Sequence, residues 1–242
     1  LSNKSTPLTG VELRCLACSR AFKIPRRPCR RTYESTKPPS FCQDGGMDLL
    51  VVVPHPDDES FGAGGALLLA KEAGLKTGVL TLTRGEAGRT LGLCPPEELP
   101  RVRVEELKRA AAVLQVDYLE VLDYPNALPE GAQGERGPAT GRGLADHPEA
   151  VEAIRTRLLH LRPRFVLTFP PDGINGHPDH VAASRYAREA AQGLAQVAYL
   201  VPPDRPWPVT HRLRLPARPL AGPPQAIAQP QTSSPFLRVC AR

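Results

Sequence analysis

One stretch decides the fold of this chain: it reads LLVVVPHPDDE and runs from Leu49 to Glu59. Its five apolar residues suit a strand buried on both faces of a sheet, and they end abruptly in a histidine and three acids. Side chains just beyond the carboxyl ends of parallel strands line the ligand crevice of an α/β sheet. We therefore expect His55, Asp57 and Asp58 to converge on one cleft.

A second stretch of the same kind lies far downstream. An apolar run predicts a strand over residues 165–169, and the segment after it contains His177, Asp179 and His180. A single His-Pro-Asp turn is more often a helix cap than a catalytic site. Two such clusters, each after a buried strand, favour a site instead. Three other histidines follow no buried strand and are interpreted as surface or capping residues: His147, His160 and His211.

Strands and helices alternate from Met47 onward in the manner of a βαβ array. The expected strands span residues 49–53, 77–83, 118–122 and 165–169, with short edge strands at 197–201 and 211–215. The expected helices span residues 62–73, 99–114, 146–161 and 178–192. The third helix is expected to open at a capping sequence that begins with Asp146. The fold class predicted is α/β, a mostly parallel sheet flanked by helices in a single domain.

Three regions are expected along the chain. Residues 1–46 form a basic, cysteine-containing leader that we interpret as disordered or non-native, because the only methionine, Met47, directly precedes the first strand. Residues 47–200 form the catalytic domain. Residues 201–242 contain ten prolines and form a tail. Within the domain, residues 125–143 are rich in Gly and Pro and predict a long surface loop over the cleft.

The positive charge of the chain is confined to the leader. Residues 1–46 hold nine Lys and Arg against three Asp and Glu, whereas the rest of the chain holds 22 of each. A neutral folded part disfavours a nucleic-acid partner. No 18-residue apolar span and no secretory signal are present in the sequence, so we expect no membrane partner and a cytoplasmic location.

The leader also carries an alternative hypothesis. Cys15, Cys18, Cys29 and Cys42 could form a small zinc site, although only the first pair has knuckle spacing. With the basic clusters, this segment supports a second function: a non-catalytic metal or nucleic-acid-binding protein. Deleting residues 1–46 would discriminate, because unchanged hydrolysis would mark the leader as dispensable.

The two clusters predict a catalytic metal centre. His55 and Asp58, three residues apart, can reach one ion together with His180, and three protein ligands leave open positions for chemistry. This donor set suits Zn²⁺, and Fe²⁺ as a second choice. Asp57 is then the natural general base. His177, when protonated, could stabilise an oxyanion or protonate a leaving amine.

Further residues complete the expected site. Asp179 is expected to orient one of the imidazoles. The glycines from Gly62 to Gly65 do not fit a dinucleotide fingerprint, and the neighbouring carboxylates would repel a pyrophosphate, so nucleotide binding is rejected there.

The sequence resembles the PIG-L/LmbE-like family of metal-dependent deacetylases. The resemblance rests on PHPDDE at 54–59 and GHPDH at 176–180, extends through RGEAGR at 84–89 and RVEEL at 103–107, and covers about residues 47–200. It is closest to the deacetylases of bacillithiol and mycothiol biosynthesis. It implies a Rossmann-like fold without a dinucleotide.

The resemblance also implies roles. Zinc would lie on His55, Asp58 and His180, with Asp57 as base and His177 stabilising the tetrahedral intermediate. Arg103 would grip the sugar or its appended acid, the alternative being a solvated helix charge. Weaker substrate-binding candidates are Arg84, Glu86 and Asn126. The implied activity is zinc-dependent removal of acetyl from a small-molecule N-acetylglucosaminide, and a homo-oligomer is an open alternative to a monomer.

Overall fold

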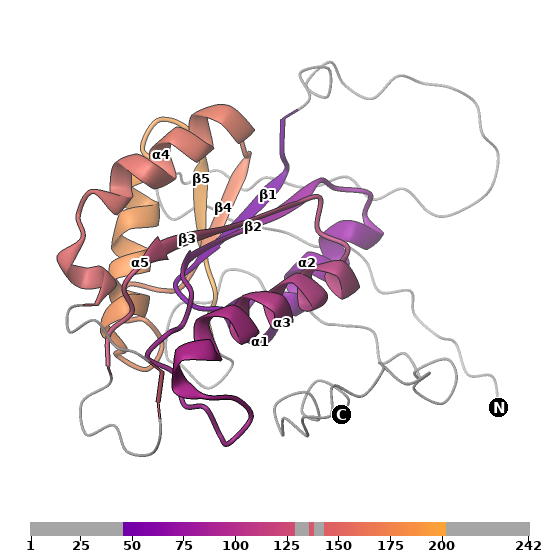
Figure 1. Cartoon of the computed structure of the whole chain (residues 1–242). Coiled ribbons are helices and arrows are strands. Elements are labelled where there is room, and N and C mark those ends of the chain that lie inside the picture. The colour runs from indigo at the N-terminus through magenta and orange to yellow at the C-terminus, as the bar shows by residue number, and fades with distance from the viewer. Residues whose placement is uncertain (1–45, 129–135, 138–142, 202–242) are drawn as a thin grey trace, which may run out of the picture.

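A five-stranded sheet forms the centre of the molecule (Figure 1). The computed structural model describes residues 46–128, 136–137 and 143–201. The strands are β1 (Leu49–Val53), β2 (Thr77–Thr83), β3 (Tyr118–Tyr124), β4 (Phe165–Thr168) and β5 (Gln196–Tyr199). The helices are α1 (Asp58–Phe61), α2 (Gly64–Glu72), α3 (Leu99–Leu114), α4 (Ala150–Leu161) and α5 (Pro178–Ala190), with the 3₁₀ turns η2 (Pro96–Glu98) and η3 (Leu144–Asp146).

All neighbouring strands pair in parallel, in the order β3-β2-β1-β4-β5. The chain first builds outward from β1 to β3 and then returns, so that β4 lies on the free side of β1. Val51 pairs with Leu167 across this junction. The loops that follow β1 and β4 therefore leave the same edge of the sheet side by side, which is where α/β sheets bind ligands. The predicted parallel α/β fold is confirmed.

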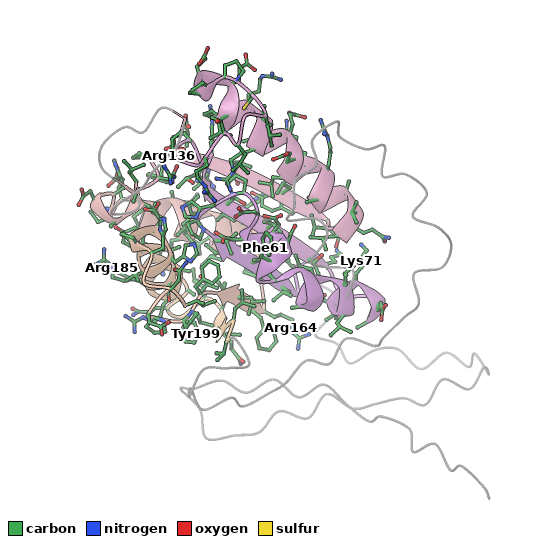
Figure 2. The ribbon with its side chains drawn as sticks, turned by 90° about the horizontal axis from the view of Figure 1, so that it is seen from below. Phe61, Lys71, Arg136, Arg164, Arg185 and Tyr199 are labelled. Carbon is green, nitrogen blue, oxygen red and sulfur yellow. The ribbon has the colours of Figure 1, made fainter. Side chains whose placement is uncertain are left out.

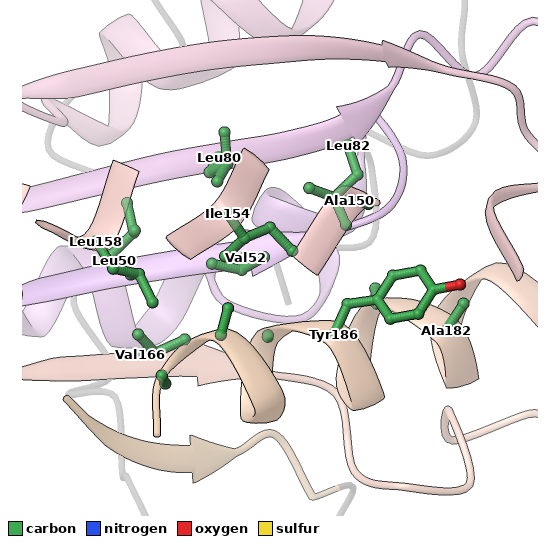
Figure 3. Packing of buried hydrophobic residues seen from close by; sticks show 14 of the residues in the cluster. Leu50, Val52, Leu80, Leu82, Ala150, Ile154, Leu158, Val166, Ala182 and Tyr186 are labelled. Atoms are coloured by element: carbon green, nitrogen blue, oxygen red, sulfur yellow. The ribbon is translucent and has the colours of Figure 1, made fainter. Parts of the chain in front are cut away.

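Each face of the sheet is covered by its own helices. Val52 and Leu80 point to the face where α4 and α5 contribute Ile154 and Tyr186, and Figure 3 shows this layer. Val51 packs on the opposite face with residues of α2 and α3. Consecutive residues of β1 thus enter opposite cores, which explains why this strand is apolar throughout.

Two predicted helices start later than expected. The helix expected over 62–73 appears as α2 and begins at Gly64, because the separate helix α1 ends just before Gly62, where an added Cβ would lie 3.0 Å from the Leu200 side chain. The capping function predicted for Asp146 is wrong: residues 144–146 form η3, and α4 begins at Ala150 without a side-chain cap. Tertiary contacts hold η3 in place, because the Tyr186 hydroxyl donates to the carbonyls of Leu144 and Ala145.

Several sequence predictions fall outside the described residues. They concern the leader and its cysteines, the proline-rich tail with the strand expected at 211–215, and most of the loop at 125–143. Among the helices of the described residues, none has the length and apolar character that crossing a membrane requires. The cytoplasmic location and the oligomeric state stay predictions.

Candidate active site

The loop after β1 turns back on itself and presents His55 and Asp58 together. The His55 amide donates to Asp58 Oδ2 at 2.9 Å, and the ring Nδ1 of His55 lies 3.4 Å from the same oxygen. Both residues are 7% exposed. The loop itself is anchored to the neighbouring strand, since the Thr83 amide and hydroxyl both donate to the Pro54 carbonyl at 2.9 Å. The two side chains are therefore held rigidly at the sheet edge.

The loop after β4 brings the second cluster to the same place. His180 Nε2 lies 3.6 Å from Asp58 Oδ1, while its Nδ1 is 3.1 Å from the Gly173 carbonyl. Gly173 has a φ of +65°, and an added Cβ would come within 2.8 Å of the His180 Cβ, so only glycine fits this turn. The Phe169 ring stacks on the His180 ring with centroids 4.3 Å apart. The predicted meeting of the two strand ends is confirmed.

Among the residues that the structure describes, two groups of side chains could hold a metal ion, and they share His55. One comprises His55, Asp58 and His180, and the other comprises His55, His177 and Asp179; in each, the donor atoms lie within 4.8 Å of one another. Only in the first group does each imidazole that binds the metal through one nitrogen have a hydrogen-bond acceptor beside its other ring nitrogen. His55 then uses Nδ1 as ligand and donates from Nε2 to Asp179, 3.1 Å away, and His180 donates from Nδ1 to Gly173. Two imidazoles and one carboxylate fit Zn²⁺ and also Fe²⁺.

The charges around this group are complementary to a cation. Burial opposes the charged form of His55, but the hydrogen bonds to Asp179 and Asp58 outweigh it and raise the pKa to about 9. Burial also works against ionisation of Asp58, yet the contact with His55 brings the pKa of this carboxyl below its usual value. The cluster therefore keeps ionised carboxylates at buried positions, where a positive charge beside them is favoured.

Asp57 differs from its neighbours in exposure and backbone. Its side chain is 53% exposed, and its φ of +121° is unusual for a residue with a side chain. The Glu59 carboxylate accepts a hydrogen bond from the Asp57 amide at 2.9 Å. Partial burial raises the pKa of Asp57 to about 6, while Arg103 acts in the opposite direction. Asp57 is thus open to the cleft and suited to exchange a proton.

Arg103 lies on α3 and binds the loop that carries Asp57. Its guanidinium donates to Asp57 Oδ2 at 2.8 Å, to the Gly85 carbonyl at 3.1 Å and to the Pro56 carbonyl. Its side chain is only 16% exposed. The alternative of a solvated helix charge is therefore wrong, and the side chain both lines the cleft and supports the proposed base.

His177 lies across the cleft from His55, with ring centroids 4.9 Å apart. It caps α5, because its Nδ1 accepts a hydrogen bond from the Asp179 amide at 3.2 Å. Burial, followed by the nearby His55, lowers the pKa of His177 to about 4. The ring is therefore neutral with its proton on Nε2, so the protonated His177 expected from sequence is wrong, and the ring is a hydrogen-bond donor to the cleft rather than a cation.

The weaker candidates separate into two kinds. Asn126 lines the cleft, and its Oδ1 accepts from the Ala87 amide at 2.7 Å. The Glu86 carboxylate accepts a hydrogen bond from the backbone amide of Asn126 at 2.6 Å and so stabilises the loop that carries Asn126. Arg84 pairs with Asp123 at 2.9 Å, is half exposed and is not among the described residues that line the cleft.

The cleft has a volume of about 340 Å³. Four of its lining residues were missed from sequence: Phe61, Ala87, Gly88 and Arg136, of which Figure 2 labels Phe61 and Arg136. Phe61 is 50% exposed and ends α1. It lies three residues after Asp58 on one helical turn, and this spacing could have indicated that the two side chains face the same cleft. Arg136 donates to the Ala87 carbonyl at 3.0 Å, a contact that no sequence spacing indicates.

These features coincide with a known family. Residues 50–191 match the model of the GlcNAc-PI de-N-acetylase (PIG-L) family. The chain belongs to this family. The resemblance drawn from the two histidine clusters is thereby confirmed, and the matched segment runs from β1 to the end of α5.

Individual relatives agree with this assignment. A 1D-myo-inositol 2-acetamido-2-deoxy-alpha-D-glucopyranoside deacetylase of Nocardia farcinica is 33% identical over 199 residues, covering 74% of this chain and 65% of the relative. A deacetylase of the same name, numbered 2, from Catenulispora acidiphila is 35% identical over 158 residues, covering 61% and 52%. This chain spans between about half and two thirds of the length of these curated relatives.

A solved structure supports the fold. The N,N'-diacetylchitobiose deacetylase of Pyrococcus horikoshii aligns with a TM-score of 0.50 and 24% identity, over 60% of this chain and 49% of that protein. At this level of identity the likeness concerns the architecture alone.

Proposed function

We propose that this chain is a metal-dependent deacetylase that hydrolyses the N-acetyl group of small-molecule N-acetylglucosaminyl conjugates. One observation carries the proposal: His55, Asp58 and His180 form a three-ligand metal group beside the half-exposed carboxylate of Asp57. Three ligands with an accessible base are typical of catalytic metal sites. Family membership and the names of the relatives support the same activity.

We infer that Zn²⁺ is the native metal, with Fe²⁺ as the alternative that the same donors accept. When bound, the ion supplies Lewis-acid chemistry, which polarises a carbonyl oxygen and makes water a better nucleophile near neutral pH. The ligand atoms would be His55 Nδ1, His180 Nε2 and the Asp58 carboxylate. Asp179 and the Gly173 carbonyl hold the two imidazoles in orientation.

The remaining steps belong to the side chains around the metal group. Asp57 accepts a proton from the attacking water as the new C–O bond forms at the acetyl carbon. The Nε2–H of His177 donates to the carbonyl oxygen as negative charge develops on it. The C–N bond then breaks, and Asp57 returns the proton to the glucosamine nitrogen, so that acetate and a free amine leave. A carboxyl whose pKa is raised to about 6 can both take and return a proton.

The side chains that line the cleft are suited to bind a sugar-containing substrate. Phe61 offers an apolar face, and the polar groups of Asn126 and Arg103 lie on the same lining. Arg103 remains a candidate for contacting the sugar or its appended group, while Arg84 and Glu86 would act only through the loops they support. Because the curated relatives are named for an inositol conjugate, we place that conjugate ahead of the malate conjugate of bacillithiol synthesis.

The test is a release assay on the full chain. Zinc-loaded protein is incubated with N-acetylglucosaminyl-inositol, N-acetylglucosaminyl-malate and N,N'-diacetylchitobiose, and acetate is measured with and without a chelator. The Asp57→Asn variant is compared with Asp123→Asn, a matched change at an exposed carboxylate that pairs with Arg84. Chelator-sensitive release that Asp57→Asn loses and Asp123→Asn keeps supports the proposal. Absence of release from every member of the panel, or full activity of Asp57→Asn, overturns it.

A further inference from the structure

Asp179 has more partners than a residue that orients one imidazole needs. It lies in the first turn of α5 and is 0% exposed. Its Oδ2 accepts hydrogen bonds from His55 Nε2 at 3.1 Å and from the Ala127 amide at 2.6 Å. Its Oδ1 accepts from the Leu144 amide at 2.9 Å. Two of its three donors are thus backbone amides outside the metal group.

The two backbone segments that Asp179 binds also touch each other. An added Cβ on Gly143 would lie 2.4 Å from the Ala127 Cβ, so the chain at 143 packs directly on the chain at 127. Asn126, the residue before Ala127, lines the cleft and is bonded to the Ala87 amide. The position of the Ala127 backbone therefore sets one wall of the cleft.

We propose that Asp179 is a positioning residue that couples the metal ligand His55 to the cleft wall at Asn126 and Ala127. A buried carboxylate shared by three donors cannot shift toward one of them without changing its distance to the others. Loss of the Ala127 amide as a donor then alters the orientation of His55, although this amide donates to Asp179 and not to a metal ligand. The inference rests on the proposed metal group but not on the reaction catalysed there.

Ala127→Pro is the variant that separates this coupling from simple support of His55. It removes the backbone N–H that donates to Asp179 and replaces none of the metal ligands. Gly143→Ala perturbs the same junction without removing a donor. Asp179→Asn replaces the shared carboxylate itself. Leu128→Ala, at an exposed neighbouring position, is the matched control.

Two readouts on the full chain test the proposal. Zinc affinity is measured by competition with a chromogenic chelator, and amide hydrogen exchange is measured on the metal-free protein. We expect Asp179→Asn to weaken zinc binding by about 10- to 100-fold, and Ala127→Pro and Gly143→Ala to weaken it by roughly tenfold, with Leu128→Ala unchanged. We also expect the amides of Ala127 and Leu144 to exchange faster in Asp179→Asn than in the wild type, while the amide of Val52 in the central strand keeps its protection.

The outcomes are decisive in both directions. Weaker zinc binding in Ala127→Pro or Gly143→Ala, with the Val52 amide still protected, supports the coupling. Wild-type zinc affinity in both of these variants, or unchanged exchange at Ala127 and Leu144 in Asp179→Asn, overturns it. If Ala127→Pro fails to fold, Gly143→Ala and the exchange of Asp179→Asn still decide. Neither readout depends on acetate release, so failure of the proposed reaction and failure of this coupling are distinguishable.

Discussion

Replacing Arg103 by Met tests how the proposed base is held. The substitution keeps most of the aliphatic stem and removes the guanidinium, which donates to Asp57 Oδ2 at 2.8 Å, to the Gly85 carbonyl at 3.1 Å and to the Pro56 carbonyl. These bonds hold Asp57 at a φ of +121°, a backbone conformation that costs about 1–3 kcal/mol and persists only where the surroundings enforce it. Without them we expect the Asp57 carboxylate to leave its place beside the metal group.

The magnitude follows from the three hydrogen bonds that the substitution removes. A hydrogen bond to a charged group contributes about 1.5–3 kcal/mol, and the lower end applies here because the Asp57 side chain is half exposed. Each bond to a carbonyl adds about 0.5–1.5 kcal/mol. A total of about 3 kcal/mol expressed in the transition state corresponds to a fall in kcat of about 100-fold. We expect the zinc content to stay at the wild-type level, because the hydrogen bonds of Arg103 go to Gly85, Pro56 and Asp57 and not to the three ligands.

The assay separates positioning from substrate binding. Steady-state kcat and KM are measured on the best substrate of the panel, together with zinc stoichiometry. Arg101→Met is the matched control, since Arg101 lies on the same helix with a side chain that is 70% exposed. Arg103→Lys should recover only part of the rate, because an ammonium cannot reproduce the planar fork. A raised KM with wild-type kcat in Arg103→Met would refute the argument and show that the guanidinium grips the substrate instead.

Three further changes have defined outcomes. Asp57→Asn should lower kcat by at least about 100-fold while a zinc assay still finds the metal, and loss of the metal would contradict the assignment of Asp57 as base. Removing the metal with a chelator should abolish acetate release, and adding Zn²⁺ should restore it; release that survives dialysis would contradict metal dependence. Leu50→Ala, at a fully buried position of β1, should lower the free energy of unfolding by about 2–5 kcal/mol in urea titrations. Leu159→Ala, at a 56% exposed position, should change it by less than about 0.5 kcal/mol, and equal effects of the two would contradict the packing.

Local patterns predicted the elements whose ends are set by their own residues. The strand at 49–53 and the helix at 99–114 appear in the structure with the predicted bounds, because an apolar run and a helical period define them. The start of α4 was predicted wrongly, since the capping sequence at Asp146 competes with tertiary contacts. Those contacts come from Tyr186 and Asp179, which lie on α5 and bind Leu144. Nothing near residue 146 in the sequence reveals them.

The same distinction applies to the site. His55, Asp58 and His180 could be brought together from sequence, because two parallel strands that end in polar clusters must present them at one sheet edge. The behaviour of Arg84 could not be derived in this way. It follows β2 and pairs with Asp123 of β3, where Thr83 is registered with Tyr124 after an irregularity in the strand pairing. That register depends on the whole sheet and is not visible in the spacing of the residues.

The rigidity of the cluster argues for catalysis over a purely structural metal. Every donor of the three-ligand group is fixed by a backbone or carboxylate contact: His55 by Asp179, His180 by the Gly173 carbonyl, and Asp58 by the His55 amide. A structural zinc site closes with four protein ligands, whereas this group among the described residues offers three. The next acidic side chain, Asp57, is turned away by its left-handed backbone and is half exposed to the cleft. The positive φ of Asp57 thus has a chemical consequence: it keeps one carboxylate of the pair out of the metal group and available to a water molecule.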